Sequence, residues 1–211
     1  MGKTRVAVMA SGRGTDFQSI IDATERGEVD IDLALLIVNN KDALAIERAR
    51  KHGIEWIFID HRKKTRTEFE EEVIKELKAR NMDLVVLAGF MRIVTSNLIS
   101  HYPNRIINIH PSLLPAFPGV RGQGDALDHG VKVSGCTIHF VDESLDGGPI
   151  ILQKAVEVLD DDTENTLADR ILEQEHIFLP LAVKLFSEGR LKIEDRRVKI
   201  NWEGMKKPSM A

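Results

Sequence analysis

The stretch Leu84-Val85-Val86-Leu87 is an unbroken apolar run inside a chain of 211 residues. Such a run is typical of a strand buried on both faces at the centre of a parallel sheet, because helices cover both sides of such sheets. Strand-like and helix-like segments alternate around it, which predicts an α/β fold with a mostly parallel central sheet flanked by helices. The expected strands are residues 5–10, 31–38, 54–59, 84–88 and 106–109, and the expected helices are residues 16–26, 43–52, 67–80 and 96–100.

The pattern changes after Pro118. A short helix at residues 124–129 is expected to precede two strands, 134–141 and 149–156, which an acidic turn joins into an antiparallel portion of the fold. A long amphipathic helix over residues 163–187 follows, with Asp162 or Thr163 as its N-cap, and residues 191–202 read as a terminal hairpin. Because 43% of the residues are apolar, the chain can form one compact domain, residues 1–211, with two halves, residues 1–103 and 104–211.

Composition excludes several classes of protein. The net charge is −4 with basic and acidic residues interspersed, so a broad nucleic-acid footprint is not expected. No apolar stretch reaches the length of a membrane span, and the amino terminus lacks the pattern of a secretory signal. Cys136 is the single cysteine, which rules out an intramolecular disulfide and favours a small core residue over a catalytic thiol. We therefore expect a soluble, reduced, cytoplasmic protein without nucleic-acid or membrane partners.

The turn Ser11-Gly12-Arg13-Gly14-Thr15-Asp16 lies between the first expected strand and helix. Its glycines allow a tight turn, and a helix amino terminus offers N–H groups to a phosphate. The turn lacks the Walker lysine, and Phe17 stands where a dinucleotide fingerprint needs glycine. Two readings stay open at this point, because any strand-to-helix turn can carry two glycines for purely structural reasons.

Asn108 and His110 lie at the carboxyl end of an expected strand, and Pro111 directly after them terminates it. Residues two apart in a strand share a face, so the amide and the imidazole should point the same way. Ligands bind beyond the carboxyl ends of strands in open α/β sheets, which favours a site over two residues that merely tie down the loop. The prolines of that loop restrict its backbone, as a preorganised site requires.

The acidic run from Asp142 to Pro149 is long for a plain hairpin turn, although aspartate and glycine are ordinary turn residues. Asp146 lies between Leu145 and Gly147, where a carboxylate can be partly shielded from water and favour a charged histidine nearby. His139 lies in the preceding strand and could face the same place. The metal-binding spacings H-x-E and H-E-x-x-H do not occur, so we expect no metal site.

These motifs make the chain resemble, over nearly its whole length, the phosphoribosylglycinamide formyltransferases, a folate-dependent family of purine synthesis. The resemblance implies a Rossmann-like formyltransferase fold. The Asn-x-His and Leu-Asp-x-Gly pair is shared by the wider superfamily, whereas the glycine turn and the Pro-Ser-Leu-Leu-Pro loop are specific to this branch. The matching stretches are residues 11–15, 88–93, 108–115, 145–153 and 174–176.

The resemblance implies transfer of a formyl group from 10-formyltetrahydrofolate to the amino group of glycinamide ribonucleotide. Asn108 and His110 would donate hydrogen bonds to the tetrahedral oxyanion, and Asp146 would favour the charged form of His110 and organise a proton relay. No covalent enzyme intermediate and no metal is needed. A monomer or a homodimer would suffice.

The substrate sites also follow from the resemblance. It implies a phosphate-binding half in residues 1–103 and a catalytic, folate-binding half in residues 104–211. The ribonucleotide residues would be Gly12, Arg13, Gly14, Thr15, Asp16, Leu172, Glu173, Gln174 and Glu175, with Glu175 near the amine. The folate residues would be Arg66, Met91, Arg92, Ile93, Val94, Asn108, Asp142, Glu143, Ser144, Leu145 and Asp146.

Two positions depart from the family pattern. Asp16 stands where the family usually has asparagine, which places a negative charge near the expected phosphate; Arg13 would compensate, or Asp16 would turn away and cap its helix. Gln123 stands where many relatives carry histidine, so no role of that histidine transfers to this chain.

Three other functions compete with this interpretation. A 10-formyltetrahydrofolate hydrolase shares the catalytic set but carries an extra amino-terminal domain, whereas the first strand here is expected at residue 5. A methionyl-tRNA formyltransferase would need an RNA-binding extension and a basic stripe. A binding module without turnover would not need Asn108, His110 and Asp146 together.

Overall fold

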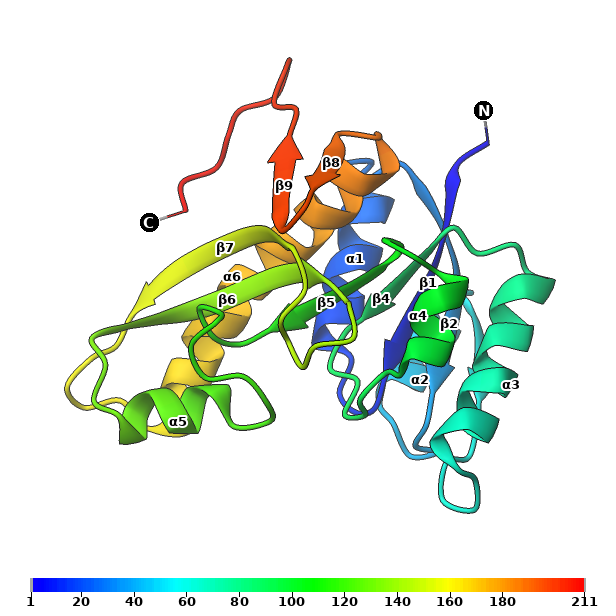
Figure 1. Ribbon diagram of the computed structural model, residues 1–211, viewed down its shortest axis with the longest axis horizontal. Coiled ribbons are helices and arrows are strands. Elements are labelled where there is room, and N and C mark those ends of the chain that lie inside the picture. Colours follow the sequence, from blue (N-terminus) through cyan, green and yellow to red (C-terminus); the bar gives the residue numbers. More distant parts are fainter. Residues whose placement is uncertain (1, 211) are drawn as a thin grey trace. The chain divides into compact units, whose positions relative to one another are not determined.

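The computed structural model describes residues 2–210 (Figure 1). The chain folds into two compact units; the first ends at Asn108 and the second begins at Ile109. The boundary falls within the last strand of the parallel series, β5. In order, the first part of the chain forms β1 (Thr4–Ala10), α1 (Thr15–Glu25), β2 (Ile31–Val38), α2 (Ala45–Lys51), β3 (Glu55–Phe58), α3 (Arg66–Ala79), β4 (Leu84–Leu87), α4 (Ser96–His101) and β5 (Ile106–His110).

The strands of the first unit are parallel and lie in the order β3-β2-β1-β4-β5. β1 therefore has β2 on one side and β4 on the other, with Val8 paired to Leu36 and to Val86. The order reverses at β1, so the loops that follow β1 and β4 lie at a topological switch point, where open α/β sheets bind ligands.

Burial confirms that residues 84–87 form a central strand. Their side chains are at most 5% exposed, as expected of a strand covered on both faces. α1 and α2 pack against each other, and α3 packs against α4. The expected strands and helices of this unit are all present, and α2 is shorter than predicted at both ends. Thr65 begins α3 with a capping box completed by Glu68.

The second unit is mostly antiparallel. β6 (Val133–Phe140) and β7 (Ile150–Glu157) form the predicted pair around the acidic turn. β9 (Arg197–Ile200) pairs in parallel with β7 and antiparallel with β8 (Leu191–Glu194), which gives the order β6-β7-β9-β8 and confirms the terminal hairpin. α6 (Glu164–Ser187) matches the long predicted helix, with Thr163 as its N-cap.

The start of α5 (Gly122–Asp128) was predicted too late in the chain. The helix begins two residues before the expected start at Gly124. Gly122 and Gly124 both have poor helix propensity, so the sequence does not predict that the helix already begins at Gly122. A Cβ atom at Gly122 would lie 3.1 Å from the Pro111 carbonyl oxygen, so close packing explains the glycine there. Within residues 2–210, no helix combines the length and the apolar character needed to span a membrane.

Candidate active site

The glycine turn after β1 is held rigidly. Gly14 is the N-cap of α1 in the left-handed conformation, with φ at 66°. A Cβ atom there would lie 2.7 Å from the Cβ of Ala45, so only glycine fits. The Ala45 N–H donates to the Gly12 carbonyl at 3.1 Å, and Arg48 Nε donates to the Arg13 carbonyl at 2.9 Å. The turn therefore presents the first N–H groups of α1 in a fixed geometry, which suits an anion.

Asp16 lies in the first turn of α1 and is 8% exposed. Gly14, rather than Asp16, occupies the N-cap position of α1. Of the two arrangements considered from the sequence, helix capping is thus wrong. Burial raises the pKa of Asp16 from 3.8 to about 6, and the charge of Arg13 opposes the shift.

We predict that Asp16→Asn stabilises the protein above pH 6. Folding disfavours the ionised carboxylate of Asp16. The free energy of unfolding of the wild type is therefore undiminished by this group below pH 3.8, and it decreases as the pH rises to about 6. A shift of that size corresponds to about 3 kcal/mol. Urea unfolding at pH 7.5 and at pH 3.5 should show a gain for Asp16→Asn only at the higher pH. Equal wild-type and variant stabilities at pH 7.5 contradict the prediction, and Asp42→Asn, at an exposed site, is the matched control.

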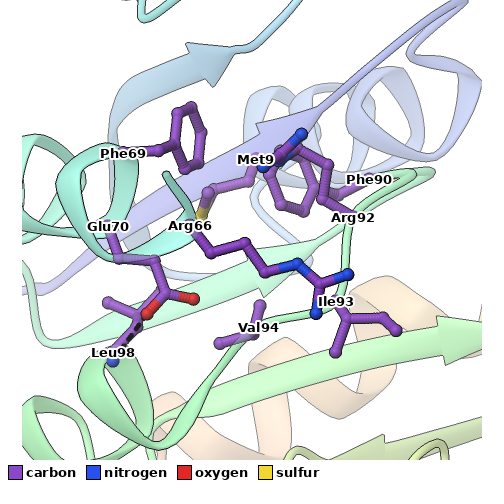
Figure 2. A pocket seen from close by; sticks show the side chains of 9 residues that line it. All are labelled: Met9, Arg66, Phe69, Glu70, Phe90, Arg92, Ile93, Val94 and Leu98. Carbon is purple, nitrogen blue, oxygen red and sulfur yellow. Dashed lines mark hydrogen bonds between the residues drawn. The ribbon is translucent and has the colours of Figure 1, made fainter. Parts of the chain in front are cut away.

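Four of the predicted folate residues of the first unit, Arg66, Arg92, Ile93 and Val94, line a hollow (Figure 2). Arg66 begins α3, and Arg92, Ile93 and Val94 belong to the irregular segment after β4. The guanidinium of Arg92 lies 5.1 Å from the centre of the Phe69 ring, in a cation–π contact. Met91 and Ile93 are 69% and 55% exposed, so apolar surface is presented beside peptide groups. The hollow is lined by Met9, Arg66, Phe69, Glu70, Phe90, Arg92, Ile93, Val94 and Leu98.

His110 ends β5 and is 4% exposed. Its Nε2 lies 2.8 Å from the Phe117 carbonyl oxygen. A carbonyl only accepts, so Nε2 carries the hydrogen and the other ring nitrogen, Nδ1, is left to face its neighbours. Nδ1 lies 3.6 Å from Asp146 Oδ2. The structure thus brings together the predicted histidine and aspartate.

Asp146 has a second histidine beside it. Its Oδ1 lies 4.0 Å from Nε2 of His139, while Oδ2 also accepts a hydrogen bond from the Gly119 N–H at 2.8 Å. His139 is 2% exposed and its Nδ1 donates to the Phe140 carbonyl. Burial lowers the pKa of His139, and the Asp146 carboxylate opposes that shift. The sequence placed His139 in the right strand and allowed it to face this place, although it was not among the predicted catalytic residues.

The acidic turn is stabilised by hydrogen bonds between its own residues. The Asp142 carboxylate accepts hydrogen bonds from the Ser144 N–H and hydroxyl. Asp146 has a positive φ of 49°, and the chain then returns through Gly148. A Cβ atom at Gly148 would lie 1.9 Å from the Phe140 carbonyl oxygen, so no side chain fits. Leu145 is 57% exposed. The turn therefore holds the Asp146 carboxylate inward while Leu145 faces solvent.

The remaining predicted residues lie on α6 and on β5. Residues 172–175 form about one turn of α6, in which Glu173 is exposed and Glu175 is buried, so the two carboxylates point to different sides. Asn108 lies on β5 opposite Leu87 of β4. Gln123 lies in the first turn of α5. Among residues 2–210, no group of three or more histidine, cysteine, aspartate or glutamate side chains could hold a metal ion.

The sequence pattern of a family described as formyl transferase matches residues 4–183. The chain belongs to the formyl transferase family. Within it, phosphoribosylglycinamide formyltransferase of Escherichia coli (strain K12) is 40% identical over 191 residues, which is 90% of each chain. The trifunctional purine biosynthetic protein adenosine-3 of Drosophila melanogaster is 43% identical over 190 residues. That match covers 89% of this chain but 14% of the longer protein.

Solved structures of formyl transferases share the fold. Glycinamide ribonucleotide transformylase 1 from Symbiobacterium toebii superposes with a TM-score of 0.92 at 49% identity, over 94% of each chain. A formyltetrahydrofolate deformylase from Pseudomonas syringae pv. tomato superposes with a TM-score of 0.89 at 30% identity. That match covers 94% of this chain and 66% of the deformylase. The predicted α/β fold, a mostly parallel sheet with antiparallel carboxy-terminal strands, is thereby confirmed.

Proposed function

We propose that this formyl transferase moves the formyl group of 10-formyltetrahydrofolate to the amino group of 5-phosphoribosylglycinamide. The products are N-formylglycinamide ribonucleotide and tetrahydrofolate, in purine synthesis. The observation that carries the proposal is the pair formed by buried His110, on the strand that also carries Asn108, and Asp146 of the acidic turn, 3.6 Å apart. Support also comes from the phosphoribosylglycinamide formyltransferase of E. coli, which matches this chain over 90% of both lengths.

The chemistry assigns a role to each group of the pair. The substrate amine attacks the formyl carbon, and the carbonyl oxygen becomes an oxyanion. Asn108 and His110 donate hydrogen bonds to this oxygen, and removing one such donor typically costs about 10²–10³ in rate. Asp146 favours the charged imidazole and helps carry the proton that the amine loses toward N10 of the departing folate. The carbon–N10 bond then breaks and tetrahydrofolate leaves.

His110 has to change partner for this role. In the structure its Nε2–H is directed at the Phe117 carbonyl oxygen, at 2.8 Å. A formyl oxygen that accepts from Nε2 must displace that carbonyl. The Ser112 hydroxyl lies 3.2 Å from the same carbonyl oxygen but donates its single hydrogen to the Ala116 carbonyl at 2.6 Å. It can replace His110 as the donor to Phe117 only by giving up that shorter hydrogen bond.

The binding sites that we propose follow the predicted residues. The phosphate would be bound by the turn Gly12, Arg13, Gly14 and Thr15, with Asp16 beside it, and the amine would be bound near Glu175 through the α6 segment. The folate would be bound by Arg66, the peptide groups of residues 91–94, Asn108 and the acidic turn. We propose residues 1–103 as the phosphate-binding half and residues 104–211 as the catalytic half of one domain. The protein would act in the cytoplasm as a monomer or homodimer on two small molecules, with no metal in this mechanism.

Hydrolysis of 10-formyltetrahydrofolate is the alternative, and the resemblance to a deformylase is the observation that keeps it in view. The two reactions differ only in the acceptor, an amine or water. We expect tetrahydrofolate release to depend on added 5-phosphoribosylglycinamide and to be slow in its absence. Absorbance of the folate with and without the amine measures both rates. Fast turnover in water alone would overturn the proposal in favour of the hydrolase.

A further inference from the structure

The segment that follows β4 is fixed at its two ends by side chains from elsewhere in the first unit. At its start, the Met91 N–H donates to the Ser11 hydroxyl at 2.9 Å. At its end, the Thr95 N–H donates to the Glu70 carboxylate at 2.7 Å. Between these points, the peptide groups of residues 92–94 make no hydrogen bond within the part of the chain that the structure describes. They are therefore available to a ligand, provided that the two fixed ends hold the backbone in place.

Glu70 makes more contacts than a helix cap requires. It lies on α3, is 3% exposed, and accepts three hydrogen bonds. These come from the Thr95 N–H, the Thr95 hydroxyl at 2.5 Å and the Leu98 N–H at 3.3 Å. α4 already has its own cap, because the Thr95 hydroxyl accepts from the Asn97 N–H at 3.3 Å. Burying a carboxylate is costly unless it is well hydrogen-bonded. The three hydrogen bonds to Glu70 therefore favour a single arrangement of Thr95 and Leu98.

The same side chain lines the hollow that contains the predicted folate residues. Figure 2 shows the Glu70 carboxylate turned toward Leu98, with Val94 alongside. Arg66 lies one helical turn before Glu70 on α3. α3 therefore contributes one side chain that is proposed to contact the folate and another that fixes the peptide segment opposite.

We infer that Glu70 is a positioning residue for the folate co-substrate. It sets the backbone of residues 91–95 so that the peptide groups of Arg92, Ile93 and Val94 meet the ligand without first having to be ordered. A segment that must be ordered on binding loses affinity, whereas a preformed one does not. The inference rests on the proposed function, because that function supplies the folate.

The test compares Glu70→Gln with Glu71→Gln, which removes an exposed carboxylate from the same helix. The glutamine keeps the size of the side chain but loses the charge and places an NH₂ where a hydrogen bond must be accepted. We expect KM for 10-formyltetrahydrofolate to rise about tenfold, the loss typical of hydrogen bonds to a charged group. KM for 5-phosphoribosylglycinamide and kcat at saturating folate should stay at the values of the Glu71→Gln control. A purely structural role predicts a lower Tm without this selective change in KM.

Two further variants keep the test decisive if Glu70→Gln folds poorly. Thr95→Val removes the hydroxyl that donates to Glu70, and Thr95→Ser retains it. The valine variant should weaken folate binding, and the serine variant should restore it. An unchanged folate KM in Glu70→Gln and Thr95→Val, or an equal rise of both KM values, overturns the inference.

Calorimetric titration with tetrahydrofolate separates this inference from the proposed function. If the wild type binds tetrahydrofolate but does not formylate the amine, the proposed function fails, and the Kd of Glu70→Gln still decides the role of Glu70. If the wild type formylates the amine and Glu70→Gln binds tetrahydrofolate as the wild type does, only the inference about Glu70 fails. If the wild type does not bind tetrahydrofolate, both fail.

Discussion

Replacing His110 by alanine is expected to lower kcat for formyl transfer by about 10²–10³, the cost of one oxyanion donor. The fold should survive, because one lost hydrogen bond is a small part of the stability of a domain, about 5–15 kcal/mol. Loss of the imidazole removes the donor to the part-buried Phe117 carbonyl oxygen, which would cost about 1–3 kcal/mol. The Ser112 hydroxyl, 3.2 Å from the same oxygen, already donates to the Ala116 carbonyl at 2.6 Å, so a modest fall in Tm is expected. Activity should therefore fall far more than stability does.

The measurement is steady-state kinetics together with thermal unfolding monitored by circular dichroism. His101→Ala is the matched control, because it removes an exposed imidazole that only bonds the Asn97 carbonyl of its own helix. KM for both substrates should change little in His110→Ala if the histidine acts mainly in the transition state. Wild-type kcat in a folded His110→Ala protein would refute the proposed mechanism.

The first unit could be predicted well from the sequence, because its strands are continuous apolar runs. β4 consists of four apolar residues and is almost fully buried, and β2 matches the predicted range at both ends. Local signals also narrowed the N-cap of α6, in the second unit, to Asp162 or Thr163, and Thr163 caps the helix. α5 was harder, because its first turn contains two glycines, which helix propensity disfavours, and a Cβ atom at Gly122 would lie 3.1 Å from the Pro111 carbonyl oxygen. Propensity carries no information about such tertiary contacts.

The site could be predicted in part, and the limits have physical causes. The pairing of His110 with Asp146, separated by 36 positions in the chain, was one of two open readings of the acidic turn until the resemblance to a family favoured it. The position of His139 beside Asp146 depends on how the turn between β6 and β7 folds back, since Oδ1 of Asp146 lies 4.0 Å from Nε2 of His139. The local pattern of β6 does not reveal that contact. The raised pKa of Asp16 likewise comes from burial, which no local pattern of α1 reveals.

Asp146→Asn is expected to reduce kcat by about 10²–10⁴, the usual contribution of a positioned acid or base. Asparagine has nearly the same shape, and its carbonyl oxygen can still accept from the Gly119 N–H, now at 2.8 Å from Oδ2. What it lacks is the negative charge beside the two buried histidines, so positive charge that develops on His110 during proton transfer has no counter-charge. The variant should thus bind both substrates with nearly unchanged KM and turn them over slowly.

Asp160→Asn is the control for loss of an aspartate, because Asp160 is 92% exposed and pairs only with Lys132 on the surface. The double variant His110→Ala with Asp146→Asn then decides whether the pair works as a unit. If Asp146 acts through His110, the double variant should be about as slow as the slower single variant, as in other catalytic groups that act together. If the factors by which kcat falls in the two single variants instead multiply in the double variant, Asp146 moves the proton by a route independent of His110. The neighbouring imidazole for such a route is His139, 4.0 Å from Asp146. A folded Asp146→Asn protein with wild-type kcat would rule out both routes.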